Sequence, residues 1–525
     1  MLHPLILLIA PAALLLAALC ALAAPGRRPR LLPTVMQAAA LCAFGAALAA
    51  AVLLVRDGPG TSALLGGDGL GFAVRLDVVS VAMSLLVSFI GWIVLRYSAT
   101  YLDGEARQGA FLGWMAATLA VVLLLVQAGN LVHLVAAWVA TSLALHRLLL
   151  FYGERIQAVR AARKKFFVAR TGELALLMAA VLLVLGYGTG DIATLNAAAR
   201  EGTAAGATQW AVVLLALAAM LKSAQFPSHG WLTEVMETPT PVSALLHAGV
   251  VNAGGFLLIR LADVVLLSPG ALAILVMVGG FTALFGGVAM LAQPTIKTSL
   301  AYSTIAQMGF MVMQCGLALF PLALLHILAH SLYKAHAFLA SGAAVETVAA
   351  ARRPGPVAIP AGRAILRAFA VALALYAAIG VFFGLAFGFA EKSPQSIALG
   401  AILILGVAYL LAQGFADAAP KALTRRTALY ALVASISYFA LQSGAEWLTA
   451  GTLPPAPSPG PMEWLLIALA VVSFALVAFA QTSFPLWADH PAAAALRVHL
   501  ANGLYANALF DRIVGNWTLR RSPDA

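Results

Sequence analysis

The chain is built from apolar runs about 20 residues long, separated by short polar segments that carry most of its charges. A helix needs about 20 apolar residues to cross the hydrocarbon core of a bilayer. Runs that meet this criterion lie at residues 4–24, 34–55, 77–97, 110–128, 130–152, 166–187, 209–226, 242–262, 270–292, 299–319, 321–345, 365–390, 395–415, 427–449 and 463–484. The pattern predicts an all-α polytopic membrane protein with about 15 transmembrane helices.

The segment 219–260 departs from this pattern, because ionisable and helix-breaking residues lie inside its apolar runs. These residues are Lys222, His229, Glu234, Glu237, His247, Pro227, Pro239, Pro241 and the pair Gly254–Gly255. An ionisable side chain at the centre of a membrane helix costs at least ~2.5–3.5 kcal/mol, so it normally faces the bundle interior or a water-filled path. Proline removes backbone donors that lipid cannot replace, which indicates a broken helix surrounded by protein or water. We therefore predict a pathway for protons or ions here.

Composition narrows the class of protein. Hydrophobic residues make up 62% of the 525 residues and charged residues 10%, with a mean hydropathy of +0.96. The surface of a soluble protein would need more charge, which excludes that class. The net charge of +11 could suggest nucleic-acid binding, but the basic residues lie in short loops, where anionic lipid and membrane orientation explain them better. The three cysteines stand alone in apolar runs and there is no Cys/His cluster, so we expect no metal and no cofactor.

Basic residues alternate between the two sides of the predicted spans. One set of loops holds Arg27, Arg28, Arg30, Arg96, Arg107, Arg155, Arg160, Arg163, Lys164, Lys165, Arg352, Arg353, Arg363, Lys421, Arg425, Arg426, Arg497, Arg512, Arg520 and Arg521. The opposite set holds only Arg56, Arg75, Arg200, Arg260 and Lys392. The basic side should face the cytoplasm, which places the N-terminus outside and the C-terminus inside. The first apolar run is long for a signal peptide and lacks a preceding basic region, so we interpret it as a retained span.

The Pro-rich segment 350–364 divides the predicted spans into two groups. We predict N-terminal transmembrane helices at 1–75, an ion-translocating core at 76–349, a linker at 350–364, C-terminal transmembrane helices at 365–490 and a tail at 491–525. The tail alternates apolar and basic residues with helical spacing. This pattern predicts an amphipathic helix that lies on the membrane or against a partner.

Lys222 lies near the end of its predicted span, five residues before Pro227. It is either a desolvated lysine that takes up and releases protons or a lysine whose ammonium group reaches the lipid headgroups. The adjacent helix break favours the first interpretation. In the preceding span, Arg170 and Glu173 share a turn and can pair with each other or with Lys222. A structural ion pair is the simpler interpretation of these two residues.

His247 lies well inside its predicted span, four residues after Ser243 and therefore on the same helix face. A histidine bonded to that hydroxyl would be structural, whereas the nearby Lys222 and Glu237 favour a role in proton transfer. Glu237 precedes the predicted helix, where a carboxylate stabilises the helix N-terminus. A capping role and a functional role both stay open for Glu237.

His326, His330 and Lys334 are spaced four residues apart, which places them on one face of a helix. Core packing does not readily explain three titratable groups on one face of an apolar span. Each step rises about 6 Å, so bridging water molecules could join the groups into a proton relay. His336 should point elsewhere. Lys297 opens the preceding span and is either an anchor at the membrane surface or the entrance to this relay.

Three segments carry a family resemblance: KSAQFPSHGWLTEVMETPTPVSALLHAG, TIKTSLAYSTIAQMGFM and LHILAHSLYKAHAFLASG. They resemble the antiporter-like membrane subunits of respiratory complex I (the NuoL type) and of Mrp sodium/proton antiporters, over roughly residues 76–346. The resemblance implies a broken-helix fold and a proton-transfer axis through Lys222, His247, Lys297, His330 and Lys334. The family has Trp-Glu in the fifth span where this chain has Trp138-Val139. A second broken-helix lysine in span 365–390 and the long lateral helix are also missing.

These departures, together with the segments 146–166 and 502–517, resemble the DabB-type membrane subunits of two-component inorganic-carbon pumps. The resemblance implies a bacterial inner-membrane subunit that conducts protons or cations and is not itself an enzyme. It also implies a DabA-like zinc protein as partner, in which CO2 would be hydrated. The alternatives are a proton-pumping subunit of a respiratory or Mrp complex and a membrane scaffold that has lost conduction. The retained Lys222, His247, His330 and Lys334 argue against a scaffold.

Overall fold

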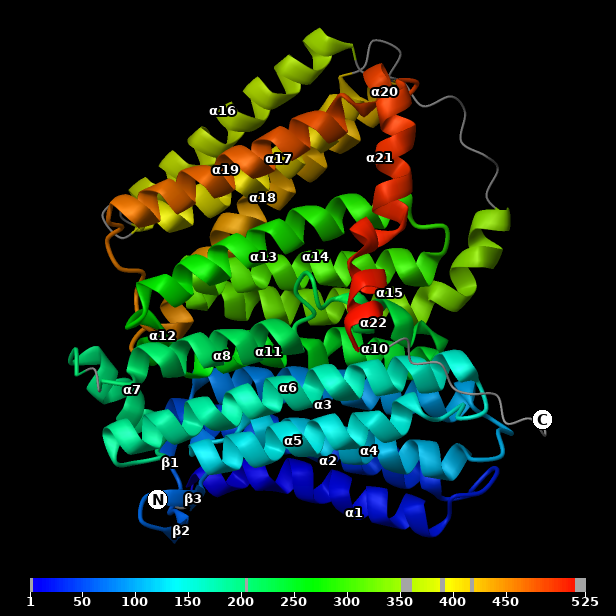
Figure 1. Ribbon diagram of the computed structural model, residues 1–525, viewed down its shortest axis with the longest axis vertical. Helices are drawn as coiled ribbons and strands as arrows, with labels where there is room; N and C mark the ends of the chain where they lie inside the picture. Colours follow the sequence, from blue (N-terminus) through cyan, green and yellow to red (C-terminus); the bar gives the residue numbers. More distant parts are fainter. Residues whose placement is uncertain (1–2, 204–205, 351–360, 388–391, 416–419, 515–525) are drawn as a thin grey trace.

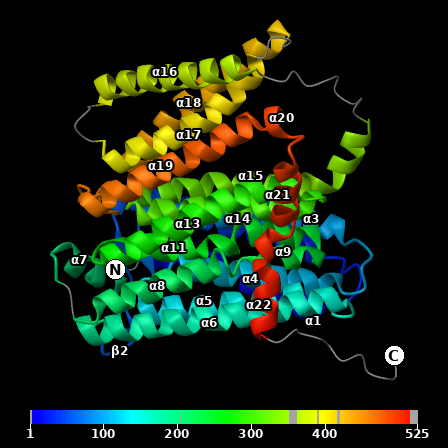
Figure 2. The same ribbon diagram turned by 45° about the horizontal axis from the view of Figure 1, so that its top comes forward.

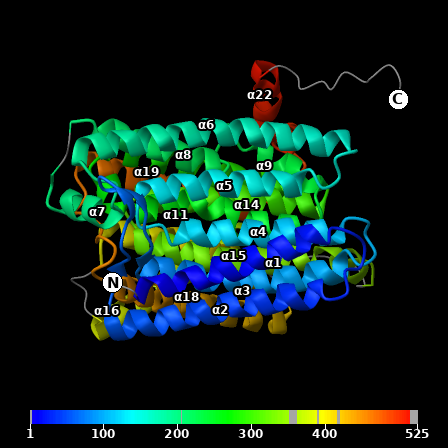
Figure 3. The same ribbon diagram turned by 90° about the horizontal axis from the view of Figure 1, so that it is seen from below.

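The computed structural model describes residues 3–203, 206–350, 361–387, 392–415 and 420–514. Its first part is a group of long helices that lie side by side (Figure 1, Figure 3). This group consists of η1 (His3–Leu8), α1 (Ile9–Ala23), α2 (Leu32–Asp57), α3 (Val78–Tyr101), α4 (Gln108–Val126), α5 (Leu131–Leu149) and α6 (Ile156–Tyr187). Two short antiparallel pairs, β1 (Gly60–Thr61) with β4 (Arg75–Leu76) and β2 (Leu65–Gly67) with β3 (Leu70–Phe72), connect α2 to α3.

The central part alternates long helices with short helical pieces. These are α7 (Ile192–Arg200), α8 (Thr208–Lys222), α9 (Gly230–Glu234), η2 (Val235–Glu237), α10 (Thr240–Ala248), η3 (Val250–Asn252), α11 (Ala253–Arg260), α12 (Ala262–Leu266), α13 (Pro269–Ala289), η4 (Met290–Ala292), α14 (Ile296–Gly316) and α15 (Phe320–Ala350). One continuous apolar core joins side chains of α1–α6 to those of α8 and α10–α15. The ion-translocating region predicted from the sequence thus packs on the N-terminal helices.

The C-terminal helices form a further layer beside α13–α15 (Figure 2). They are α16 (Gly362–Phe387), α17 (Pro394–Gly414), α18 (Lys421–Thr449) and α19 (Pro461–Thr482). Side chains of α16, α17 and α18 share a separate apolar cluster, and α17 and α19 pack on α13–α15 through another.

The tail crosses one end of the long helices, from α19 to α6 (Figure 1). It consists of α20 (Phe484–Trp487), α21 (Pro491–Ala501), η5 (Gly503–Tyr505) and α22 (Ala506–Val514). Its described part packs on its own chain: Asp511 of α22 accepts hydrogen bonds from α6, and α21 contacts α13. Trp517, which the sequence placed in the amphipathic helix, lies outside the described residues.

Every apolar run identified in the sequence coincides with a helix or with a broken helix, which confirms the all-α membrane fold. Within the described ranges, 13 helices are long and apolar enough to cross a membrane. Thr208–Lys222 is apolar but shorter. Its 15 residues rise only about 22 Å, against a hydrocarbon core of about 30 Å. The chain therefore ends this helix inside the membrane thickness.

Two predicted boundaries are wrong. Helix α6 begins at Ile156, not at residue 166, so Lys164 and Lys165 lie in the helix and are buried instead of belonging to a cytoplasmic loop. Both amines find partners inside the protein, which lets the helix continue through them. The run 242–262 is not one helix, because it breaks at Gly249 into α10, η3 and α11. Gly254 and Gly255, which the sequence predicts as helix-breaking residues, lie within helix α11.

Candidate ion-transfer site

Two helix breaks meet at the centre of the molecule. Helix α8 ends at Lys222, and the hydroxyl of the next residue, Ser223, donates a hydrogen bond of 2.9 Å to the carbonyl of Val251 in the break between α10 and α11. Gly254 permits this contact, because a Cβ there would overlap the Ala219 carbonyl and the Ser223 hydroxyl. Protein groups therefore satisfy the broken backbone, as a break at membrane depth requires.

The Lys222 amine lies over an indole ring inside the bundle. Its Nζ is 4.5 Å from the centre of the Trp138 ring on α5, and Trp138 is almost fully buried. No carboxylate among the described residues forms an ion pair with Lys222; the charges of Glu173 and Arg170 on α6 act on it from further away. Lys222 is half-buried, and both interpretations of its role stay predictions.

His247 is fully buried on α10 and stacks on Phe338 of α15, with 4.4 Å between ring centres. Neither ring nitrogen has a hydrogen-bond partner among the described residues. The sequence placed Ser243 on the same face as a possible partner, but the Ser243 hydroxyl lies 3.4 Å from that of Thr238. The hydrogen bond between His247 and Ser243 that a purely structural role would use is therefore not formed.

The predicted column on α15 faces α10. The ring centres of His326 and His330 are 5.9 Å apart, and His330 Nε2 lies 3.3 Å from the backbone carbonyl of His247. Lys334, one turn further, is fully buried and donates a hydrogen bond of 3.2 Å to the Leu300 carbonyl of α14. His336 is exposed, as its spacing predicted. Of the three titratable groups, His330 contacts the broken α10, whereas His326 packs on Phe310 of α14 and Lys334 binds α14.

Lys297 lies in the first turn of α14, half-buried and three residues before Leu300, whose carbonyl binds Lys334. Both roles predicted for Lys297, surface anchor and entrance, remain predictions.

One contact of this region was not predicted from the sequence. Asn252, in the break between α10 and α11, donates a hydrogen bond of 2.8 Å to the Ser331 hydroxyl of α15. A buried polar residue at the helix break was the signal that could have identified it.

Of the remaining candidate residues, three form ion pairs and one has a side chain outside the described residues. Arg170 and Glu173 pair with each other at 2.6 Å, as the simpler interpretation predicted. Glu234 pairs with Lys164 at 2.6 Å. The side chain of Glu237 lies outside the described residues, so its two predicted roles stay open.

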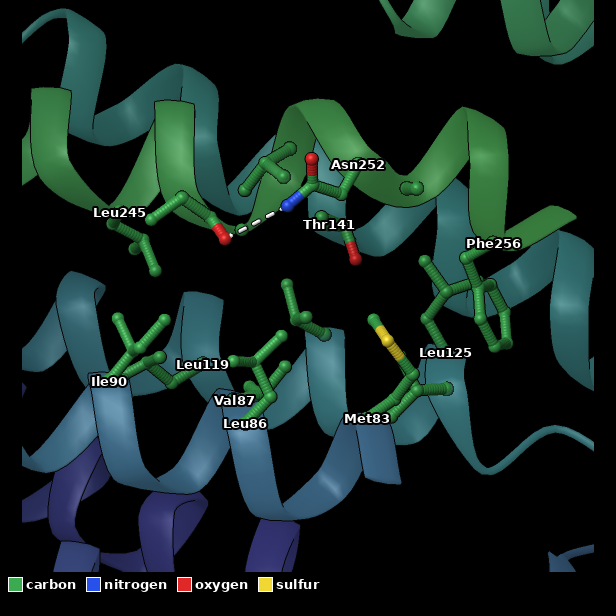
Figure 4. Close-up of a pocket in the computed structure, with 16 residues that line it drawn as sticks. Met83, Leu86, Val87, Ile90, Leu119, Leu125, Thr141, Leu245, Asn252 and Phe256 are labelled. Atoms are coloured by element: carbon green, nitrogen blue, oxygen red, sulfur yellow. Dashed lines mark hydrogen bonds between the residues drawn. The ribbon is translucent and has the colours of Figure 1, made fainter. Parts of the chain in front are cut away.

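A small cavity lies beside the α10–α11 break, between α3, α4 and α5 (Figure 4). Its volume is about 20 Å³, which is enough for about one water molecule. Figure 4 shows apolar side chains of α3 and α4 on one side and Thr141 and Asn252 on the other. The Asn252 amide also donates to the Ala248 carbonyl at 3.0 Å, closing the gap left by the missing helix bond.

A separate group of paired charges surrounds Asp77, the residue that precedes α3. Arg260 of α11 donates to the Asp77 carboxylate at 2.6 Å, both side chains being buried, and Arg75 approaches the same carboxylate at 3.3 Å. Burial alone would raise the pKa of Asp77, but Arg260, the Ser80 amide and Arg75 outweigh it and hold that pKa below its usual range. These groups line a cavity of about 250 Å³.

The described residues contain no group of three or more His, Cys, Asp or Glu side chains that could hold a metal ion. The buried chemistry of the site consists of lysine and histidine with few carboxylates. Such a set can bind and pass protons.

Comparison with known proteins finds matches to membrane subunits of the same fold. The family model described as NADH:quinone oxidoreductase/Mrp antiporter, TM, matches residues 128–354, and the model described as NADH-Ubiquinone oxidoreductase (complex I), chain 5 N-terminus, matches residues 66–112. The solved structure of the Mrp complex from Dietzia sp. DQ12-45-1b superimposes with a TM-score of 0.61 at 24% identity, covering 98% of this chain and 60% of that chain.

Two curated relatives are closer in sequence. The probable inorganic carbon transporter subunit DabB2 of Halothiobacillus neapolitanus is 36% identical over 527 residues, which cover 97% of this chain and 93% of the relative. The probable inorganic carbon transporter subunit DabB of Hydrogenovibrio crunogenus is 45% identical over 276 residues, covering 52% of this chain and 53% of the relative. These matches identify a multi-span membrane subunit of an ion-conducting class. The chain belongs to the antiporter-like family of complex I and Mrp membrane subunits and, within it, to the DabB group.

Proposed function

We propose that this chain is the ion-conducting subunit of an energy-coupled inorganic-carbon pump, in which proton or cation flux drives one-way CO2 hydration by a zinc-bearing, DabA-like partner. The observation that carries the conducting role is the column of His326, His330 and Lys334 on α15, whose middle member His330 contacts the buried His247 at a helix break. Charged groups are rarely kept at membrane depth without a role in transport.

In this proposal Lys222 and Lys334 are proton-exchanging groups on either side of His247. Lys334 acts electrostatically on His247, and His330 touches the His247 carbonyl. A proton that reaches one group raises the cost of a second positive charge next to it, because like charges interact strongly at low dielectric. Protons therefore pass along the axis one at a time, and water can bridge the gaps between side chains.

Transport of inorganic carbon is supported by the names of the relatives, which are probable inorganic carbon transporter subunits. In this proposal the catalytic zinc resides in the partner, and the chain faces that partner in the inner membrane with its basic loops in the cytoplasm. If the chain served a respiratory or Mrp complex instead, it would co-purify with other subunits of that complex and not with a zinc protein.

The test is Lys222→Met in cells that lack other inorganic-carbon uptake systems. Methionine keeps the length and loses the proton site, so we expect no growth at air-level CO2, although the protein inserts and binds its partner. Growth equal to that of wild type, at equal protein level, would refute the proposed role of Lys222. Co-purification of the wild-type chain with its genomic neighbour, followed by zinc analysis, tests the partner.

A further inference from the structure

One face of α5 carries three residues that line up toward Lys222. Trp138, Ser142 and His146 are four residues apart, so they lie above one another at steps of about 6 Å. The Lys222 amine lies over Trp138, as described above. On the next turn, Ser142 accepts two hydrogen bonds from Lys165 of α6, at its carbonyl (2.9 Å) and its hydroxyl (3.0 Å). The two amines thus occupy consecutive turns of one helix face.

Among the described residues, Lys165 is a buried amine without a counter-ion. Its residue is 5% exposed, and among the described residues no carboxylate forms an ion pair with it. Its neighbour Lys164 is equally buried but is paired with Glu234 and Asp511. A charge at membrane depth costs at least ~2.5–3.5 kcal/mol, and the buried amine of Lys165 does not reach the headgroups. A structural role as a peg between α5 and α6 would be served better by a neutral hydrogen-bonding side chain.

His146 is the third of the three residues on this face of α5. It lies in the last turn of the helix, next to the basic loop that leads into α6. It is half-buried, its ring packs on Phe166, and its Nδ1 has no hydrogen-bond partner among the described residues. The charges of Lys165, Arg147 and Arg170 all act on it. His146 therefore lies between the end of the bundle and the first buried amine.

The charges around Lys165 are unbalanced. Lys222, Glu173 and Arg170 face it from α8 and from its own helix. Glu173 is the one carboxylate among the groups that act on Lys165, and it already pairs with Arg170. When both lysines carry a proton, their repulsion in a low-dielectric interior is large. Protonation of Lys165 therefore promotes release of a proton from Lys222, and the reverse.

We propose that His146 and Lys165 form the entry half of the proton path to Lys222, along the interface of α5 and α6. His146 takes a proton at the basic end of the bundle and passes it to Lys165 Nζ, which passes it to Lys222 Nζ. In each step the donor becomes neutral and the acceptor becomes a cation, and water bridges the gap where the groups do not touch. This inference rests on the proposed role of Lys222.

Arginine distinguishes a proton station from a structural peg. Lys165→Arg keeps the charge and the hydrogen-bond donors, but a guanidinium does not release its proton in proteins. Lys165→Met removes both properties. If Lys165 relays protons, both variants should lose transport; if it only holds α5 to α6, the arginine variant should retain it. Arg163→Met is the matched control, because Arg163 lies on the same helix with an exposed side chain.

The experiment measures uptake of labelled inorganic carbon by cells that express the full chain with its genomic neighbour. We expect both Lys165 variants to lose about tenfold or more of the uptake rate, as for removal of a proton-transfer group, and Arg163→Met to stay within about twofold. His146→Gln should also slow uptake and remove one pH-dependent step from the uptake profile. If Lys165→Met does not accumulate in membranes, the uptake rate of His146→Gln tests the proposed entry path instead.

Three outcomes would overturn the inference: wild-type uptake in Lys165→Met, retention in Lys165→Arg of more than half of the wild-type rate, or a wild-type rate and pH profile in His146→Gln. Lys222→Met is measured in the same cells. If Lys222→Met transports normally, the proposed function itself fails. If Lys222→Met is inactive and Lys165→Arg is active, only the entry path fails.

Discussion

A cluster of charged side chains around Lys164 holds the tail against the bundle, and removing the lysine tests how strongly it does so. Its amine is 2.6 Å from Glu234 Oε1 and from Asp511 Oδ1, and it donates to Asn507 Oδ1 at 2.7 Å. Arg160 donates to the other oxygen of Asp511 at 2.7 Å. The Lys164 side chain is 1% exposed. This cluster ties α22 to α6 and α9, and so holds the tail over the segment that follows the α8 break.

Lys164→Met leaves Glu234 without its cation and leaves Asp511 with Arg160 alone. Removal of one partner from a buried ion pair costs about 3–5 kcal/mol. Glu234 is 22% exposed and Asp511 8%, so water relieves part of the penalty and we expect about 3 kcal/mol. Asp511→Asn keeps the Lys164–Glu234 pair and should cost less, about 1.5–3 kcal/mol for the lost charged hydrogen bonds. The double variant should be less destabilised than the sum of the two single variants.

The assay is thermal unfolding of the detergent-purified chain, combined with protease cleavage of the tail in membranes. Arg28→Met is the matched control, because Arg28 and Asp103 form an ion pair at 3.0 Å with side chains 66% and 55% exposed. Such pairs contribute about 0–1 kcal/mol. We expect Lys164→Met to lower the melting temperature and to expose the tail, and Arg28→Met to do neither. A Lys164→Met protein with wild-type melting and a protected tail would show that the tail is not held by this cluster.

Two further predictions concern the α15 column and the buried pair of Asp77 and Arg260. His330→Ala should reduce transport severely and His336→Ala much less, because only His330 faces α10; equal losses at equal expression would mean that packing causes the phenotype. Asp77→Asn should destabilise the protein by about 3–5 kcal/mol because it leaves Arg260 buried without a carboxylate. In the same unfolding experiments, exposed Asp57→Asn should have little effect. Since the folded-state pKa of Asp77 is lowered, this stability is present at neutral pH and lost as the pH falls through that pKa; an acid-insensitive difference between wild type and Asp77→Asn would contradict this.

The sequence predicted the elements that depend on local pattern. Apolar runs define the helices because the bilayer sets their length, and the four-residue spacing of His326, His330 and Lys334 defines one face because helix geometry is fixed. The break after Lys222 was visible in the polar residues and prolines that follow it. These features need no knowledge of distant contacts, so a single sequence was sufficient.

Features that depend on partners far along the chain were missed. Lys164 and Lys165 looked like loop charges, because their partners Asp511 and Ser142 lie hundreds of residues away or on another helix. The break at Gly249 was missed because Gly254 and Gly255 were the more obvious pair. Tertiary packing decides between such glycines: Gly254 and Gly255 are needed for close contact with α8 and with Met311, and they can stay helical.

The position of the two breaks relative to each other explains why polar groups collect here. Each break frees backbone groups that lipid cannot satisfy, and Ser223 and Asn252 satisfy some of them across the gap. The same Asn252 reaches Ser331 of α15, between His330 and Lys334. The α15 column is thus attached to the weakest point of α10, where a small backbone change costs few helix hydrogen bonds. His330 contacts the His247 carbonyl, so the break in α10 and the column on α15 are joined by contacts of two residues, Asn252 and His330.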